Sequence, residues 1–239
     1  MKTNALKKRM FHLVFLLYFA CGYAPLHSLT MSQDWDAYQK EVLKEKPNFP
    51  GWCPDEKALH IMNLLLTNNS EICVEVGVFG GSSFFPMAAA LAYKKTGIAY
   101  AIDPWNNEEC LEGYKEEMDK HYKYWSAVNL DKVMNKFVEG MHKNDLDAIY
   151  RIMRISSAQA YPRFKDQSID FIHIDGNHSE KSAIFDVEHW LPKVKSGGII
   201  CFDDAWWEST QPAIKMLLKE CDIMQESSPK WQYIFLQKR

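Results

Sequence analysis

The chain has 239 residues, with 28 basic and 31 acidic side chains and a net charge of -3. That length supports one substantial core, and the composition is that of an ordinary globular protein. No basic excess points to nucleic acid, which is therefore not an expected partner. The six cysteines are scattered without a C-x-x-C pair, so buried free thiols are expected rather than a disulfide framework or a zinc site.

Residues 1–30 have the layout of a signal peptide. Basic residues at 7–9 precede an apolar run at 10–20, and small residues follow. The alternative is a non-functional extension, with Met31 opening the protein. The expectation is thus an exported or membrane-anchored protein, with membrane contact only if the segment is retained, or a cytoplasmic protein if the segment is not a working signal.

Strand-like and helix-like segments alternate along most of the chain. The run ICVEV is apolar apart from one glutamate, as in a buried parallel strand. The stretch 105–150 is too long for a simple connection and is expected to hold helices that cover the site. The expected helices are 34–46, 54–69, 84–95, 158–164, 180–194 and 210–219. The expected strands are 72–76, 99–103, 151–156, 168–175, 198–204, 221–225 and 231–237.

This alternation predicts a single α/β domain over residues 31–239. We expect a doubly wound, Rossmann-like sheet of seven strands, mostly parallel with an antiparallel C-terminal strand, and with helices on both faces. Ligands of such sheets bind beyond the carboxyl ends of the strands, so polar residues at those ends carry the functional information.

The first such end is a glycine turn that follows the strand ICVEV. It reads Glu75-x-Gly77-x-x-x-Gly81-Ser82-Ser83, and its glycines allow a tight turn and close approach of the backbone to a ligand. A dinucleotide fingerprint would need glycine at position 79, where this chain has phenylalanine, which argues against a pyrophosphate. A plain glycine turn into a helix is the alternative.

The second end is Asp103, which closes the next strand. An acid at this distance from a glycine turn grips ribose hydroxyls in nucleotide-binding folds. Taken alone, the residue could equally cap a helix or a turn.

The third and fourth ends place three carboxylates together. Asp175 follows one strand and Asp203 and Asp204 follow the next, so the three converge if those strands are neighbours. Like charges so close require a cation, and oxygen ligands suit magnesium, manganese or calcium. His178, three residues after Asp175, is the candidate general base, although a loop role is the alternative; His173, inside the strand, is expected to be structural.

Trp206 and Trp207 follow the last of these acids. They could line an acceptor pocket or pack under the covering helices, and the sequence leaves both open.

With these motifs the chain resembles the class I S-adenosylmethionine-dependent methyltransferases. Within them it is similar to small O-methyltransferases that include macrolide-sugar and aminocoumarin-sugar enzymes. The resemblance runs from about Gly51 to the C-terminus, and I-D-F-I-H-I-D-G-N-H and L-P-K-V-K-S-G-G-I-I-C-F-D-D are its most specific parts.

The resemblance implies a cofactor, a metal and a base. Glu75, Gly77, Gly81, Ser82 and Ser83 would hold the amino-acid end of S-adenosylmethionine, Asp103 the ribose, and the region around Ser157 the adenine, with Asp175 beside the cofactor. Asp175, Asp203 and Asp204 would ligate Mg²⁺ or another divalent cation, and His178 with Asp175 would be catalytic.

The expected function is therefore divalent-metal-dependent O-methylation of a hydroxyl group on a small molecule, sugar-like, polyol or phenolic. The acceptor is the expected partner, and a homo-oligomer is one alternative for the assembly. Two other functions stay open from the sequence: an NAD(P)-dependent oxidoreductase, and a catalytically inactive exported binding module of the same fold.

Overall fold

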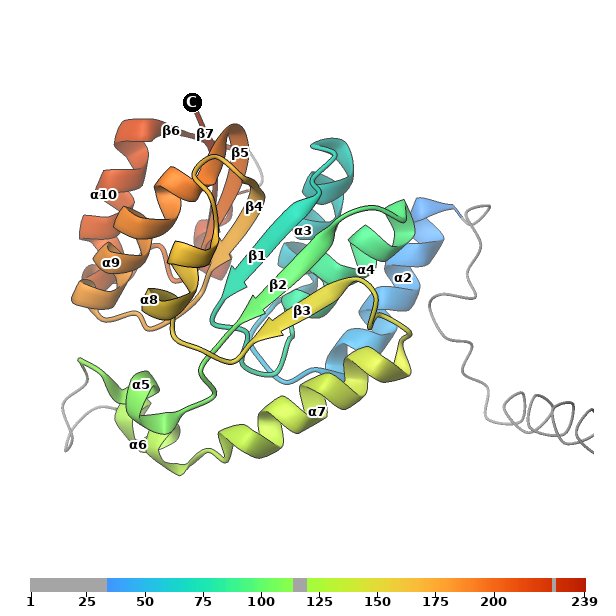
Figure 1. The fold of residues 1–239 in the computed structure, drawn as a ribbon, viewed down its shortest axis with the longest axis horizontal. Helices are drawn as coiled ribbons and strands as arrows, with labels where there is room; N and C mark the ends of the chain where they lie inside the picture. Colours follow the sequence, from blue (N-terminus) through green and yellow to red (C-terminus); the bar gives the residue numbers. More distant parts are fainter. Residues whose placement is uncertain (1–33, 114–119, 225–226) are drawn as a thin grey trace, which may run out of the picture.

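A seven-stranded sheet in the order β3-β2-β1-β4-β5-β7-β6 forms the centre of the molecule (Figure 1). The computed structural model describes residues 34–113, 120–224 and 227–239. The strands are β1 Ile72–Val76, β2 Ile98–Ile102, β3 Tyr150–Met153, β4 Ile169–Ile174, β5 Val194–Phe202, β6 Cys221–Ile223 and β7 Ile234–Lys238. β7 runs antiparallel to both of its neighbours, β5 and β6, whereas β1 to β5 pair in parallel. The predicted doubly wound, mostly parallel sheet with an antiparallel C-terminal strand is confirmed.

Helices cover both faces of this sheet. The α-helices are α2 Trp35–Glu45, α3 Asp55–Thr67, α4 Phe84–Lys94, α5 Asn107–Leu111, α6 Lys120–Ala127, α7 Leu130–Lys143, α8 Ser157–Ala160, α9 Glu180–Trp190 and α10 Gln211–Glu220. Short 3₁₀ turns are Lys46–Asn48, Tyr161–Arg163, Leu191–Lys193, Glu208–Thr210 and Pro229–Trp231. Figure 1 shows α5 and α6 beyond the arrowheads of the strands that end near them, at the edge where ligands of such sheets bind.

Alternate residues of each central strand enter different cores, because successive strand side chains point to opposite faces. Cys73 and Phe171 pack with α2, α3, α4 and α7 on one face. Val74 and Ile172 pack with α8, α9 and α10 on the other face. Both faces of the central sheet are therefore buried, which explains why these strands are almost continuously apolar.

The connection into β5 differs from the expectation. The helix expected over 180–194 ends at Trp190, because a short 3₁₀ turn containing Pro192 follows it. β5 then begins at Val194, which pairs with Ile169 before a register shift. The polar stretch ahead of the apolar run therefore belongs to the strand.

The signal-like segment and the cysteines can be compared with the structure only where residues are described. The signal-like segment 1–30 lies outside them. Within residues 34–113, 120–224 and 227–239, no helix has the length and apolar character needed to cross a membrane. The five described cysteines are free thiols, and all but Cys110 are buried.

Candidate active site

A cavity of about 1120 Å³ lies at the carboxyl ends of β1, β2, β4 and β5. That volume exceeds the usual range for one small ligand, so a cofactor and an acceptor fit together. Most residues predicted for the site line it: Gly77, Ser82, Ser83, Asp103, Ser157, Asp175, His178, Asp203 and Asp204. Two predicted cofactor residues, Glu75 and Gly81, are not on its wall.

The strand register brings these residues to one level. The backbone N–H groups of Gly77, Asp175 and Asp203 each donate to the last carbonyl of the neighbouring strand, at 2.9, 2.9 and 3.0 Å. Each residue is thus the first one past the end of its strand. Parallel neighbours in register place such residues in a row, which is why sequence-distant side chains face the same cavity.

The glycine turn is shaped by close approach of other groups. Gly77 has a φ of +87°, and a side chain there would overlap the carbonyl oxygen of Asp175. Gly81 has a φ of +86°, and a side chain there would overlap the ring of Phe137. Glu75 is fully buried behind the turn and accepts a hydrogen bond from Ser83 Oγ at 2.6 Å. Glu75 and Gly81 therefore shape the turn from behind.

Asp103 is held by two backbone N–H groups. Its carboxylate accepts hydrogen bonds from the N–H groups of Phe79 at 2.8 Å and Trp105 at 2.7 Å. Burial raises the pKa of this carboxyl to about 6, although the backbone hydrogen bonds favour the ionised form. The side chain can accept from a ligand hydroxyl when it is ionised.

Ser157 belongs to a partly buried network that the sequence did not reveal in full. Its hydroxyl donates to Asp186 and accepts a hydrogen bond at 2.8 Å from the indole N–H of Trp190. Asp186 also lines the cavity, and burial raises its pKa to about 6. A signal for Asp186 existed, because it interrupts the buried stripe that Ala183 and Val187 form on α9.

His178 lies between two of the predicted carboxylates. Its Nδ1 is 2.9 Å from Asp204 Oδ2 and its Nε2 is 3.4 Å from Asp175 Oδ1. Burial lowers the pKa of the imidazole, but the two carboxylates outweigh it and raise the pKa to about 10. The ring of Trp207 meets His178 edge-on at 5.4 Å and lines the cavity, whereas Trp206 is 46% exposed and does not.

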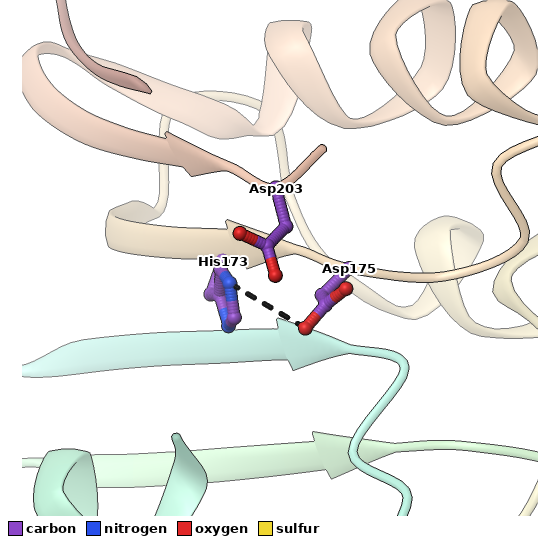
Figure 2. A group of neighbouring side chains, drawn as sticks. All are labelled: His173, Asp175 and Asp203. Atoms are coloured by element: carbon purple, nitrogen blue, oxygen red, sulfur yellow. Dashed lines mark ion pairs between the residues drawn. The ribbon is translucent and has the colours of Figure 1, made fainter. Parts of the chain in front are cut away.

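Asp175 and Asp203 form a second group with a histidine. Figure 2 shows their carboxylates facing each other near the ring of His173, with an ion pair between His173 and Asp175. One ligand atom from each of the three residues lies within 4.8 Å of the others. Asp204 is not part of this group, because its carboxylate is turned to His178. Burial and the charge of Asp203 raise the pKa of Asp175 to about 6.

A lysine completes this group. Lys57 Nζ, on α3, is 2.9 Å from Asp203 Oδ1, and its side chain is 1% exposed. Burial is the largest single influence and lowers its pKa, but Asp203 and the other negative groups around it together hold the pKa well above the usual value. The sequence prediction missed this residue. A signal was present, because Lys57 falls on the buried stripe of α3 with Ile61 and Leu65.

The predicted set of three aspartates does not fit a divalent metal in this arrangement. Asp203 is already neutralised by Lys57, and Asp204 by His178. At an effective dielectric constant of 20, an ion of charge +2 about 4 Å from an ammonium is repelled by roughly 8 kcal/mol. The magnesium site therefore stays a prediction from the sequence.

Aromatic side chains form one wall of the cavity. Trp52, 67% exposed, stacks on Phe79 with centroids 5.4 Å apart and meets Tyr124 and Trp125 edge-on. Phe79 belongs to the glycine turn, while Tyr124 and Trp125 come from α6. We call these four residues the aromatic wall. No motif in the sequence predicts that they meet.

The strand order and the position of the cavity define the class I methyltransferase fold. The methyltransferase domain family matches residues 74–205, more than half of the chain. The chain belongs to this family. The resemblance inferred from the sequence is thereby confirmed at the level of the family, and the match assigns the chain to methyltransferases rather than to nicotinamide-dependent oxidoreductases.

Several known proteins are similar to this chain. Tapetum-specific methyltransferase 1 of Arabidopsis thaliana is 26% identical over 157 residues, which are 66% of this chain and 56% of that protein. The O-methyltransferase NovP superposes with a TM-score of 0.60 at 16% identity, over 77% of this chain and 80% of NovP. An O-methyltransferase from Bacillus cereus, solved in complex with S-adenosylhomocysteine, superposes with a TM-score of 0.54 at 15% identity. The superposition covers 86% of this chain and 92% of that protein. In three curated relatives the matched region covers 13%, 65% and 56% of the length of the relative, so this chain spans less than two thirds of each of them.

Proposed function

We propose that this protein transfers a methyl group from S-adenosylmethionine to a hydroxyl oxygen of a small ring-bearing molecule. The observation that carries the proposal is a single cavity in which a glycine turn and Asp103 face a histidine held between two carboxylates. The similarity to structures named O-methyltransferases supports oxygen as the methylated atom.

The cofactor would lie along the row of strand ends. The turn at Gly77 leaves room for the backbone to approach the amino-acid end, and Ser82 and Ser83 are on the same wall. Asp103 would accept from the ribose hydroxyls. Ser157 and Asp186 form the polar wall suited to the adenine amine, since both line the cavity.

His178 would accept the proton of the acceptor hydroxyl. With a pKa of about 10 the free enzyme holds its ring as an imidazolium at neutral pH. The sulfonium of a bound cofactor is a like charge, and a like charge lowers the pKa of an imidazolium. A deprotonated His178 ring would take the hydroxyl proton, and the bound cofactor would supply the methyl group that the acceptor oxygen receives. Asp204 and Asp175 stabilise the imidazolium that results.

The acceptor would bind against the aromatic wall. Trp52 presents an exposed indole at the cavity, and flat rings stack on such surfaces. Trp207, beside His178, lines the same cavity. Phenolic and sugar rings both fit this chemistry, so both belong in the test.

The test is transfer of a labelled methyl group from S-adenosylmethionine to panels of phenols, sugars and polyols, with and without a chelator. His178→Ala is compared with His142→Ala, because His142 is an exposed histidine that pairs with Asp147 outside the cavity. We expect His178→Ala to lower turnover by about 100-fold or more, the usual contribution of a general base, with S-adenosylhomocysteine still bound. His142→Ala is expected to match the wild type.

Two results would contradict the proposal. A chain that neither binds S-adenosylhomocysteine nor methylates any acceptor is the inactive binding module instead. Full turnover in His178→Ala would remove the histidine from the proton transfer. Turnover that disappears with the chelator and returns with magnesium would restore the metal to the mechanism.

A further inference from the structure

We propose that Lys57 is the resident cation of this site: its ammonium takes the place of a divalent metal at Asp203 and holds the Asp203 and Asp175 carboxylates beside the methyl-transfer centre. The inference rests on the proposed function, because that function identifies the methyl-transfer centre. The test of the inference measures metal binding and does not depend on turnover.

Two features of the position of Lys57, its burial and its place on the helix, are unfavourable for a cation. Its side chain is almost fully buried, and burying an ammonium group costs several kcal/mol. It also lies in the first turn of α3, where the helix dipole disfavours a positive charge. Only the Asp203 carboxylate offers it an ion pair among the described residues. A lysine held in such a place has a specific electrostatic role in the site.

That role follows from the charges around it. Each carboxylate expected to ligate a metal already has a cationic or protonatable side chain of this chain beside it. Lys57 pairs with Asp203, and His178 pairs with both Asp175 and Asp204. The three acids therefore do not form the uncompensated cluster that attracts a divalent ion.

The geometry makes Lys57 a positioning residue. Asp203 and Asp175 line the cavity, but Lys57 does not, so its ammonium approaches Asp203 from the α3 side. On that side its Nζ also lies 5.8 Å from the centre of the Tyr233 ring, an additional favourable contact for a cation. Lys57 acts on bound molecules through the carboxylates that it holds.

The test measures Mn²⁺ binding to the full chain by the loss of the electron paramagnetic resonance signal of free Mn²⁺, with S-adenosylhomocysteine present. The proteins are the wild type, Lys57→Met, Asp203→Asn, the Lys57→Met/Asp203→Asn double variant and Lys46→Met. Lys46 is the matched control, because it is a buried lysine that pairs with Asp55 at 3.0 Å and does not line the cavity.

We expect the wild type and Lys46→Met to show no more Mn²⁺ binding than Asp203→Asn. Lys57→Met should gain stoichiometric binding, at least about 100-fold tighter than the wild type, because a neighbouring like charge is gone. The double variant should lose that gain, which places the ion at Asp203. A lysine with only a structural role would not produce a new metal site.

Stoichiometric Mn²⁺ binding by the wild type that Asp203→Asn abolishes would overturn the inference. So would a folded Lys57→Met protein that binds S-adenosylhomocysteine but gains no Mn²⁺. If Lys57→Met does not fold, the comparison of wild type with Asp203→Asn decides alone, since it requires no change at Lys57.

Discussion

Gly77 illustrates how one residue connects the two halves of the site. It follows β1, and its Cα approaches the backbone that follows β4 so closely that a methyl group would overlap the Asp175 carbonyl oxygen. Its positive φ adds a conformational requirement that glycine meets without strain. The glycine turn and the carboxylate group are therefore fixed relative to each other.

Replacing Gly77 with alanine should separate these halves. We expect S-adenosylhomocysteine affinity to fall at least about ten-fold and stability to fall by about 2 kcal/mol or more, from strain plus overlap. Calorimetric titration and urea unfolding measure the two effects. The control is Gly197→Ala, since Gly197 also has a positive φ of +77° but open space around the missing side chain. Equal losses of affinity in both variants would mean that strain, and not the contact with Asp175, is responsible.

Lys57 marks the boundary of what the sequence could predict at the residue scale. The strand-end residues were predictable, because a continuous apolar run announces where a buried strand stops. Lys57 lies 146 positions before Asp203, and no local pattern records that the start of α3 meets the end of β5. The pairing of Asp204 with His178 was equally hidden, because it depends on the direction in which each carboxylate points.

At the scale of elements, α7 packs against the two turns that follow β1 and β2 at the cavity. Phe137, fully buried on α7, contacts Gly81 of the glycine turn. Its ring also stacks with Trp105, which follows Asp103, and meets Phe84 of α4 edge-on. One side chain thus connects α7 with both turns, the glycine turn and the one at Asp103, that line the cavity.

Phe137→Ala should therefore lower both the stability of the protein and its affinity for S-adenosylhomocysteine. Removing a buried phenylalanine destabilises by about 3–5 kcal/mol through the cavity it leaves. We also expect weaker S-adenosylhomocysteine binding, because both turns lose a neighbour. Leu217→Ala on α10 is the control, since Leu217 is equally buried in the core on the other face of the sheet. Urea unfolding gives the stability of each variant, and calorimetric titration at a temperature where both variants are folded gives the affinity. Unchanged affinity in Phe137→Ala would mean that α7 has only a structural role.

Elements with one strong periodicity were predicted better than those set by tertiary contacts. The bounds of β1 match the sequence expectation because its apolar run ends at a glycine. β5 begins earlier than expected because Val194 is recruited by pairing with Ile169, across a register shift. Sequence cannot report such a shift, since the residues between are polar and the pairing partner lies far away along the chain.

At the scale of the whole molecule, the site concentrates charge inside a protein with a net charge of only -3. The pKa values of the buried carboxyls Asp103, Asp175 and Asp186 are raised to about 6, chiefly by burial, and that of His178 is raised to about 10 by its two carboxylates. All four groups bind protons more tightly in the folded chain than in the unfolded chain. Folding therefore takes up protons near neutral pH.

The direction of the pH dependence follows from these shifts. Between pH 7.5 and 5.5 the folded chain binds more protons than the unfolded chain, so stability should rise as the pH falls, by roughly 1 kcal/mol for each group. Urea unfolding across this interval should show a gain of about 3–4 kcal/mol. In Asp103→Asn the gain should be smaller by about 1 kcal/mol, because one of the four groups no longer titrates. A stability that falls from pH 7.5 to 5.5 in the wild type would contradict the assignment of these groups as buried and proton-binding.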